Sequence, residues 1–408
     1  MSEFEIKEKA GDARIGHLHL KDTDLETPHL FPVVSFYGGG NEEALFGGGF
    51  HRTVKEFMVN HPNQVSDGDD YSDLFDGVMT SVSSITDFSI SEKKLEEYLS
   101  KELKEWDAFK DFEGTIFLDS GGFKVMTQGG LQGNNFEKEI DQEAAYELQR
   151  KIGGDILVNL DHPILPDDSY EVRVEKAEKT IKNAKEFIEI SEDFEGARYL
   201  TVHGYNKSMM ERFFDQAEEE FEQPIDEMFD GIALGSLVPK KDDYNTLIDA
   251  VGGCKEVMEE RGLDEMPMHV LGISSSAIPL LVLLGADTFD SGTYFQSAIN
   301  GNYMTSLTNH ISLDEAREKN FSDCDCRVCS DKKLREKMKG NAEYKKDIYG
   351  PVAIHNMEIQ RREIEKLKGK IRDGEDALRR HIEDKVGNKE NIKKFAYRVV
   401  NKSLEEYF

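Results

Sequence analysis

Three aspartates and a histidine each close a short apolar run that is typical of a buried strand. Asp119 closes TIFLD, Asp161 closes DILVNLD, His203 closes YLTVH and Asp290 closes ADTFD. In a parallel barrel the carboxyl ends of all strands meet at one rim, where catalytic groups lie. A single aspartate there is often only the N-cap of the next helix, but four polar residues at one rim favour a site. Two carboxylates facing one cavity predict displacement at an anomeric carbon, with one as nucleophile and the other as proton shuttle.

The residues around these aspartates favour a flat ligand. A third carboxylate could bind a ligand that carries N–H donors. Gly121 and Gly122 have no side chains and let such a ligand approach the backbone, and Phe123 could stack on it. Gly235 and Ser236 follow another apolar run and lie at the same predicted rim.

A cysteine cluster predicts a metal site. Its members are Cys324, Cys326 and Cys329. Three cysteines within six residues are poorly placed for disulfides and suit thiolate coordination of zinc, which needs a fourth ligand. His310 lies just upstream, and His355 and His381 lie downstream. No open coordination position is implied, so the site is expected to be structural; the alternative is free thiols in a loop. Cys254 is expected to be a separate buried thiol.

The elements that must position these residues alternate between strand and helix. Eight apolar runs are predicted as strands, at 32–36, 77–83, 115–119, 155–161, 199–203, 231–235, 268–272 and 286–290. Helix-period segments lie at 137–151, 170–191, 208–221, 244–261 and 276–284. This alternation predicts a parallel sheet, and eight units predict a (β/α)8 barrel. A doubly wound sheet is the competitor, but no G-x-G-x-x-G motif follows the first run.

Size and charge bound the class of protein. The chain has 408 residues, and 38% of them are hydrophobic, so it can bury a sizeable core. No apolar run approaches the roughly 18 residues of a membrane span, and the charged N-terminus lacks a signal sequence, so a cytoplasmic location is expected.

The net charge of the chain is strongly negative. Asp and Glu number 81 against 51 Lys and Arg, a formal net charge of −30. Acidic proteins ordinarily repel phosphates, but the Debye length falls to about 3 Å in 1 M salt, so a halophilic setting would permit binding. Segment 356–408 carries 14 Lys and Arg against 11 Asp and Glu. That segment reads either as a solvated helical face or as a place where a polyanion is tolerated.

These motifs together resemble one family. Residues 119–123 (DSGGF) resemble the signature of the tRNA-guanine transglycosylases, and Phe289-Asp290 resembles their nucleophile motif. The cysteine spacing with His355-Asn356 resembles their zinc site, and residues 4–34 are similar to the archaeal branch. The similarity covers about residues 4–370 in order. The resemblance implies a (β/α)8 catalytic barrel over 1–310 with an insertion near 38–76, a zinc-binding subdomain over 311–370, and a helical extension over 371–408.

The resemblance also implies a base exchange. Asp290 would attack C1′ of a target guanosine, and a covalent glycosyl-enzyme would form. Asp119 would act as general acid/base, and a 7-deazaguanine would replace guanine. The implied base-binding residues are Ser120, Gly121, Phe123, Asp161, His203, Gly235, Ser236 and Leu271, and the implied zinc ligands are Cys324, Cys326, Cys329 and His355. Two of these positions depart from the family, which usually has Gln at 203 and Gly at 236.

The polynucleotide substrate is a separate question. Archaeal tRNA enzymes usually carry C-terminal RNA-binding domains, for which this chain leaves no room. That favours the short branch that inserts 7-deazaguanines such as 7-cyano-7-deazaguanine into DNA, often in viruses, where the location would be the host cytoplasm. tRNA modification is the second expectation. A non-catalytic partner subunit and a sugar glycosidase are further alternatives. Family members are often homodimers, so a homodimer is also expected, with no membrane partner.

Overall fold

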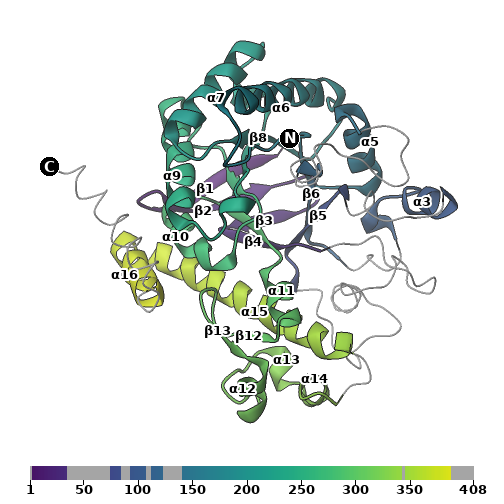
Figure 1. The fold of residues 1–408 in the computed structure, drawn as a ribbon, viewed down its shortest axis with the longest axis vertical. Helices are drawn as coiled ribbons and strands as arrows, with labels where there is room; N and C mark the ends of the chain where they lie inside the picture. Colours follow the sequence, from purple (N-terminus) through teal and green to yellow (C-terminus); the bar gives the residue numbers. More distant parts are fainter. Residues whose placement is uncertain are drawn as a thin grey trace. The chain divides into compact units, whose positions relative to one another are not determined.

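The computed structural model describes residues 2–34, 74–83, 92–106, 112–122, 140–341 and 345–386. These fall into two compact units (Figure 1). The first consists of residues 1–30, 158–290 and 364–408, and the second of residues 31–157 and 291–363. Among the described residues, no helix combines the length and the apolar character that crossing a bilayer requires.

Eight strands form one parallel sheet. They are β4 (His29–Pro32), β5 (Gly77–Ser81), β6 (Thr115–Asp119), β7 (Ile156–Val158), β8 (Ala197–His203), β9 (Gly231–Gly235), β10 (Met268–Val270) and β11 (Thr288–Ser291). Their order is β4-β11-β10-β9-β8-β7-β6-β5. Beyond β4, Val33 forms a parallel bridge to Met79 of β5, and the Val34 N–H donates to the Met79 carbonyl at 2.8 Å. This bridge joins the two ends of the strand order, so the prediction of a (β/α)8 barrel is confirmed and the doubly wound sheet is excluded.

The first unit contains several helices, two of which pack against β8. The helices are α6 (Tyr170–Ile190), α7 (Lys207–Glu220), α8 (Ile225–Met228), α9 (Tyr244–Glu260), α10 (Ile278–Leu283) and α16 (Glu375–Val386), with short 3-10 turns η4 (Val238–Lys240) and η5 (Ser275–Ala277). α6 and α7 contact each other and β8, and α9 contacts α7 (Figure 1). Ser169, Asn206 and Asp243 cap the N-termini of α6, α7 and α9 with side-chain oxygens.

A small antiparallel sheet in this unit has no counterpart among the predicted elements. It consists of β1 (Glu3–Ala10), β2 (Ala13–His19) and β3 (Asp24–Thr27). Arg14 of β2 forms a buried ion pair with Asp287, with Nε to Oδ1 at 2.7 Å. The same guanidinium donates to the Met266 carbonyl, and Asp287 also accepts the Met268 N–H at 2.8 Å. These bonds satisfy both buried charges and fix the start of strand β10.

The second unit contains β5, β6 and the residues that follow β11. Its other elements are α3 (Glu92–Tyr98), η2 (Leu103–Glu105), α5 (Gln142–Ile152), α11 (Thr293–Ile299), β12 (Asn302–Met304), β13 (His310–Ser312), α12 (Leu313–Glu318), α13 (Arg327–Ser330), α14 (Lys332–Met338) and α15 (Lys345–Arg372), the last of which continues into the first unit. β12 and β13 pair antiparallel. Asn356 of α15 joins this region to α11, because its amide accepts the Met304 N–H and donates to the Tyr294 carbonyl.

Some predicted boundaries differ from the observed ones. β6 and β9 match the predicted strands, and α6, α7 and α9 match within one residue. The first barrel strand starts at His29 rather than at residue 32. Pairing begins there because the His29 N–H donates to the Asp287 carbonyl. Residues 35–36 of that predicted strand, residues 38–73 of the predicted insertion, Phe123, and residues 387–408 of the predicted extension lie outside the described residues.

Candidate active site and metal centre

Asp290 at the end of β11 is held through one carboxylate oxygen. Its Oδ1 accepts the Gly272 N–H at 2.7 Å and lies 3.3 Å from His269 Nε2. Its Oδ2 has no hydrogen-bond partner among the described residues. The residue is 6% exposed, so this oxygen is largely shielded from bulk water. A carboxylate anchored at one oxygen and unpaired at the other has the geometry of a nucleophile whose direction is fixed.

Two partners of Asp290 were not predicted from the sequence. His269 is fully buried in β10, and its Nδ1 lies 2.8 Å from Thr288 Oγ1. If the threonine hydroxyl donates to Nδ1, Nε2 carries the proton and donates to Asp290. Gly272 has φ +68°, and a Cβ there would lie 2.4 Å from Val238 Cγ2, so only glycine fits. A histidine inside an apolar run was the available signal, but such a residue is more often part of the core.

Asp161, His203 and Ser236 form a second buried group in the first unit. His203 Nδ1 lies 2.9 Å from Ser236 Oγ, and that oxygen also accepts the Ile164 N–H at 2.9 Å. His203 Nε2 lies 3.3 Å from Asp161 Oδ2, without the alignment of a hydrogen bond. Asp161 is 4% exposed and has no other polar partner among the described residues. A buried carboxylate that lacks N–H donors is costly unless a ligand supplies them.

This contact explains why the two departures from the family pattern occur together. Ser236 has one hydroxyl proton, and among the described residues the only acceptor beside it is His203 Nδ1. If the Ser236 hydroxyl donates to Nδ1, Nε2 of His203 carries a proton. Gly235 makes room for the ring, since a Cβ there would lie 2.8 Å from His203 Cε1. His203 therefore offers one N–H donor beside the carboxylate of Asp161.

Asp119 ends β6 in the second unit. Its Oδ2 accepts the Ser81 hydroxyl at 2.8 Å and the Gly121 N–H at 2.9 Å. Ser81 is the residue opposite Asp119 in the pairing of β5 with β6, so the sheet register sets this contact. Ser83 in turn donates from its backbone N–H to Ser81 Oγ at 3.1 Å. These bonds orient the Asp119 carboxylate from the backbone of two neighbouring strands.

The other predicted base-binding residues are placed as follows. Ser120 is fully buried directly after β6. Leu271 is half-buried after β10, and its N–H donates to the Leu234 carbonyl at 3.0 Å. Asp119, Ser120 and Gly121 belong to the second unit, and the other described members of the set, with Asp290, belong to the first.

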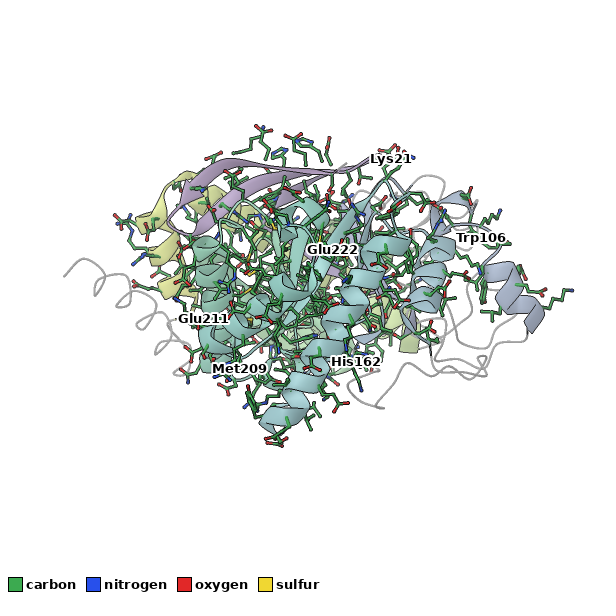
Figure 2. All side chains as sticks on the ribbon, turned by 90° about the horizontal axis from the view of Figure 1, so that it is seen from above. Lys21, Trp106, His162, Met209, Glu211 and Glu222 are labelled. Atoms are coloured by element: carbon green, nitrogen blue, oxygen red, sulfur yellow. The ribbon has the colours of Figure 1, made fainter. Side chains whose placement is uncertain are left out.

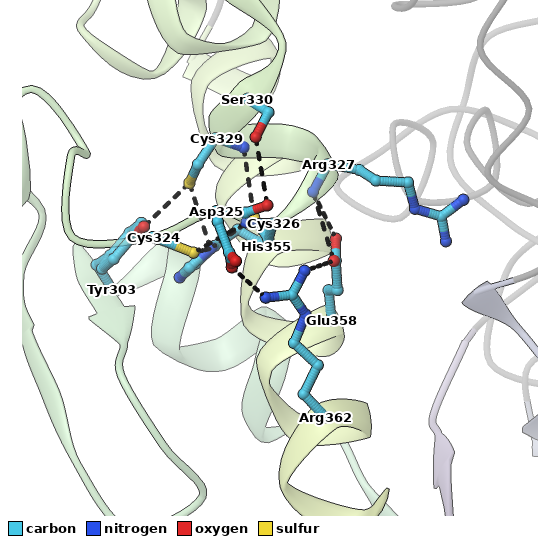
Figure 3. A network of polar contacts seen from close by, with 10 residues as sticks. All are labelled: Tyr303, Cys324, Asp325, Cys326, Arg327, Cys329, Ser330, His355, Glu358 and Arg362. Atoms are coloured by element: carbon cyan, nitrogen blue, oxygen red, sulfur yellow. Dashed lines mark hydrogen bonds and ion pairs between the residues drawn. The ribbon is translucent and has the colours of Figure 1, made fainter.

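The four predicted metal ligands come together in the second unit (Figure 3). Their ligand atoms all lie within 4.8 Å of one another. His355 Nδ1 is 3.7 Å from Cys324 Sγ, 3.3 Å from Cys326 Sγ and 3.5 Å from Cys329 Sγ. Tetrahedral zinc with its usual bond lengths places sulfur and nitrogen ligands about 3.6 Å apart. The cluster therefore fits a metal ion, and neither His310 on β13 nor His381 on α16 belongs to it.

The groups around the cluster prepare it for a cation. His355 donates from Nε2 to the Met304 carbonyl at 2.9 Å, which leaves Nδ1 free as a ligand. The N–H groups of Cys326 and Cys329 point at Sγ of Cys324 and Cys326, at 3.5 and 3.3 Å. These donors stabilise the thiolates that a metal requires.

Tyr303 covers one side of the cluster. Its ring stacks on the His355 ring with centroids 3.7 Å apart and an interplanar angle of 10°. Its hydroxyl lies 3.0 Å from Cys329 Sγ (Figure 3). Burial, and then the charge of Cys329, raises the pKa of Tyr303 far above its ordinary value, so the hydroxyl stays protonated and donates to the sulfur. On the other side, Glu358 accepts the Arg327 N–H and pairs with Arg362 at 2.7 Å.

Comparison with protein families identifies the class. The model of the TGT family, described as queuine tRNA-ribosyltransferase, matches residues 78–386. The match covers most of the chain, including β5 to β11 and the metal cluster. The chain belongs to this family of enzymes.

Several similar curated proteins are archaeal and are named tRNA-guanine(15) transglycosylase. The protein of Methanocaldococcus jannaschii is 27% identical over 417 residues, which cover 98% of this chain and 54% of that protein. The protein of Pyrococcus abyssi is 28% identical over 92% of this chain and 55% of its own length. The protein of Sulfolobus acidocaldarius is 26% identical over 100% of this chain and 71% of its own length. The chain thus spans about half the length of the first two.

Proposed function

We propose that this protein is a guanine transglycosylase that exchanges a guanine base in tRNA for another purine-like base. The observation that carries the proposal is Asp290, whose Oδ1 is fixed by Gly272 and His269 while its Oδ2 has no partner among the described residues. Family membership supports the reaction class. The buried Asp161 carboxylate supports guanine as the base, because guanine offers N–H donors to it.

The reaction proceeds by two displacements at one carbon. Asp290 Oδ2 attacks C1′ of the target guanosine, the C1′–N9 bond breaks, and its electron pair leaves with guanine. Asp119 gives a proton to the departing base. Asp119 then takes the N9 proton of the incoming base, which attacks C1′ and releases Asp290. The two inversions restore the β configuration, as in retaining glycosidases.

Asp161 and His203 recognise the base. Guanine and 7-deazaguanines present adjacent N–H donors and a carbonyl acceptor on one edge. The buried Asp161 carboxylate accepts the N–H groups, and the His203 Nε2–H donates to the carbonyl. This pairing offsets the desolvation of Asp161, which has no other N–H partner among the described residues. The family resemblance implies that Gly235, Ser236, Ser120, Gly121 and Leu271 also contribute to base binding and that Phe123 stacks on the base. We propose a 7-deazaguanine as the incoming base.

The metal is structural zinc held by Cys324, Cys326, Cys329 and His355. Bound to four protein ligands, it has no open position and supplies cross-linking rather than chemistry. It joins the loop before α13 to α15, and Asn356, the next residue on α15, ties that helix to β12. The cluster therefore stabilises the region that follows β11.

The substrate proposal differs from the leading expectation of the sequence. Chain length favoured DNA, whereas the three relatives described above are named for tRNA. Their agreement supports tRNA as the polynucleotide.

The test is exchange of radiolabelled guanine into unmodified tRNA in one reaction and into duplex DNA in another, each at low and at molar KCl. We expect label in tRNA with the wild type and none with Asp290→Asn. Asp226→Asn, at an exposed position of α8, removes the same charge and should exchange normally. Label in DNA alone would make the tRNA assignment wrong, and no label in either polynucleotide would overturn the activity.

A further inference from the structure

A cavity of about 110 Å³ opens beside His203, between α6 and α7 of the first unit. Its floor is apolar and includes Ile164, Val174 and Phe213. The ring of His203 borders the cavity, and its edge faces Phe213, with ring centroids 6.1 Å apart. Met209 of α7 lines it as well; Figure 2 shows this residue on the same face as His162, which follows Asp161. The cavity therefore adjoins the group proposed to recognise the base.

Two guanidinium groups at this cavity have no carboxylate partner among the described residues. Arg173 donates to the Pro166 carbonyl at 2.6 Å, and its Nε is buried without a hydrogen-bond partner. Arg212 is exposed, and its one polar contact among the described residues is with the Tyr170 ring, 5.5 Å from the ring centroid. Two acids near the start of α6 are paired with lysines, Asp168 before the helix with Lys176 at 2.7 Å and Glu175 with Lys179 at 2.8 Å, and Glu171 accepts the Ser169 hydroxyl at 2.8 Å.

The rim of the cavity also carries an exposed aromatic ring. Tyr170 is 60% exposed and Val172 is 37% exposed, and among the described residues they are the two large hydrophobic side chains that lie open to solvent. Both lie in the first turn of α6. An exposed aromatic ring beside unpaired guanidiniums is the combination that binds a nucleotide, since the base stacks on the ring and the phosphate pairs with Arg.

We propose that this cavity binds one nucleotide of the polynucleotide substrate, next to the target guanosine. Its base stacks on Tyr170, and its phosphate lies between Arg173 and Arg212. The assignment rests on the proposed function and adds a binding site that neither the family match nor the resemblance assigns. In a chain of net charge −30, unpaired guanidiniums at one cavity mark where a phosphate can approach.

The test measures the KM for tRNA and the KM for guanine separately, using the whole chain. Tyr170→Ala and Arg212→Ala should each raise the KM for tRNA about tenfold, with little change in the KM for guanine. Arg212→Ala should also reduce the slope of log affinity against log salt by about one. Tyr170→Phe keeps the ring and should restore most of the affinity. Lys182→Ala, an exposed cation elsewhere on α6, is the matched control and should leave both constants unchanged.

The outcomes separate this inference from the proposed function. A wild type without exchange refutes the function, and anisotropy of fluorescent tRNA still reports whether the variants lose binding. Exchange with an unchanged KM for tRNA in both alanine variants refutes the nucleotide site. An effect of Arg212→Ala without one of Tyr170→Ala indicates a simple anion site and also refutes it. A raised KM for guanine places the cavity in the base site instead.

Discussion

The metal cluster and the carboxylates at the strand ends differ in whether their polar atoms have hydrogen-bond partners. At the cluster, the fourth ligand His355 bonds the Met304 carbonyl with its second nitrogen, and Tyr303 donates to Cys329. At the strand ends, Asp290 Oδ2 has no donor among the described residues, and the Asp161 carboxylate has only His203 Nε2 nearby, 3.3 Å away without the alignment of a hydrogen bond. The first arrangement is closed and stabilises the fold. The second leaves carboxylate oxygens available, and we propose that a substrate supplies their partners.

The largest expected effect follows removal of one metal ligand. Cys326→Ser should bring zinc content near zero and lower the free energy of unfolding by several kcal/mol, because metal binding contributes directly to folding. Zinc analysis and urea unfolding measure both. The control is Cys254→Ala, which removes the buried cysteine outside the cluster and should keep one equivalent. One equivalent retained in Cys326→Ser would show that the ligand set is wrong.

The next effect is catalytic and should leave stability unchanged. Asp119→Asn should lower kcat for guanine exchange by about 10²- to 10⁴-fold, because it removes general acid/base catalysis. The amide oxygen can still accept from Ser81 and Gly121, so the unfolding midpoint should stay within error. Ser81→Ala removes one orienting bond and should cost much less. An equal loss of kcat in Asp119→Asn and Ser81→Ala would contradict a proton-transfer role for Asp119.

A smaller effect is expected on the zinc affinity of the metal cluster. Tyr303→Phe keeps the stack on His355 and removes the hydroxyl beside Cys329. Zinc affinity should fall by about tenfold or more, as measured by competition with a chelator. Tyr294→Phe is the matched control, since Tyr294 is buried in the same unit and its hydroxyl donates to the Val33 carbonyl instead. If both variants hold zinc equally, the Tyr303 hydroxyl does not tune the site.

The smallest effect concerns the base-binding group. Ser236 has φ +68°, a conformation that glycine adopts readily, which offsets part of the loss of the hydrogen bond from the Ile164 N–H, so Ser236→Gly should lower stability only slightly. It removes the partner of His203 Nδ1, and one hydrogen bond contributes about 1 kcal/mol, so the KM for guanine should rise about fivefold. Exchange kinetics and thermal unfolding, measured together, test this separation. An unchanged KM for guanine would show that Ser236 does not contribute to base recognition.

The sequence predicted the repeated strand–helix units well because apolar runs and helix periods are local. Strand β7 is shorter than its apolar run, since Asn159 leaves the ladder and accepts the Thr201 N–H with its side chain at 2.8 Å. The cluster of cysteines was predicted from spacing alone. The ion pair of Arg14 with Asp287 was not, because it joins residues 273 positions apart.

The candidate site was predicted in its carboxylates but not in what holds them. Asp119 and Asp290 lie at the ends of β6 and β11 and Asp161 follows β7, and a sequence shows such positions directly. His269 contacts Asp290 and Ser81 contacts Asp119 because of the strand register and the directions of the side chains. Both depend on how the strands pair, which the sequence does not show. The contact between His203 and Ser236 likewise appears only once β8 and β9 lie in register.

The most direct test of the central claim is the identity of the covalently modified residue. The protein is incubated with unmodified tRNA, denatured and digested with nuclease and protease, and the peptides are analysed by mass spectrometry. We predict a ribosyl adduct on Asp290 in the wild type and no adduct in Asp290→Asn. An adduct on another residue, or one that persists in Asp290→Asn, would contradict the assignment of Asp290 as the nucleophile.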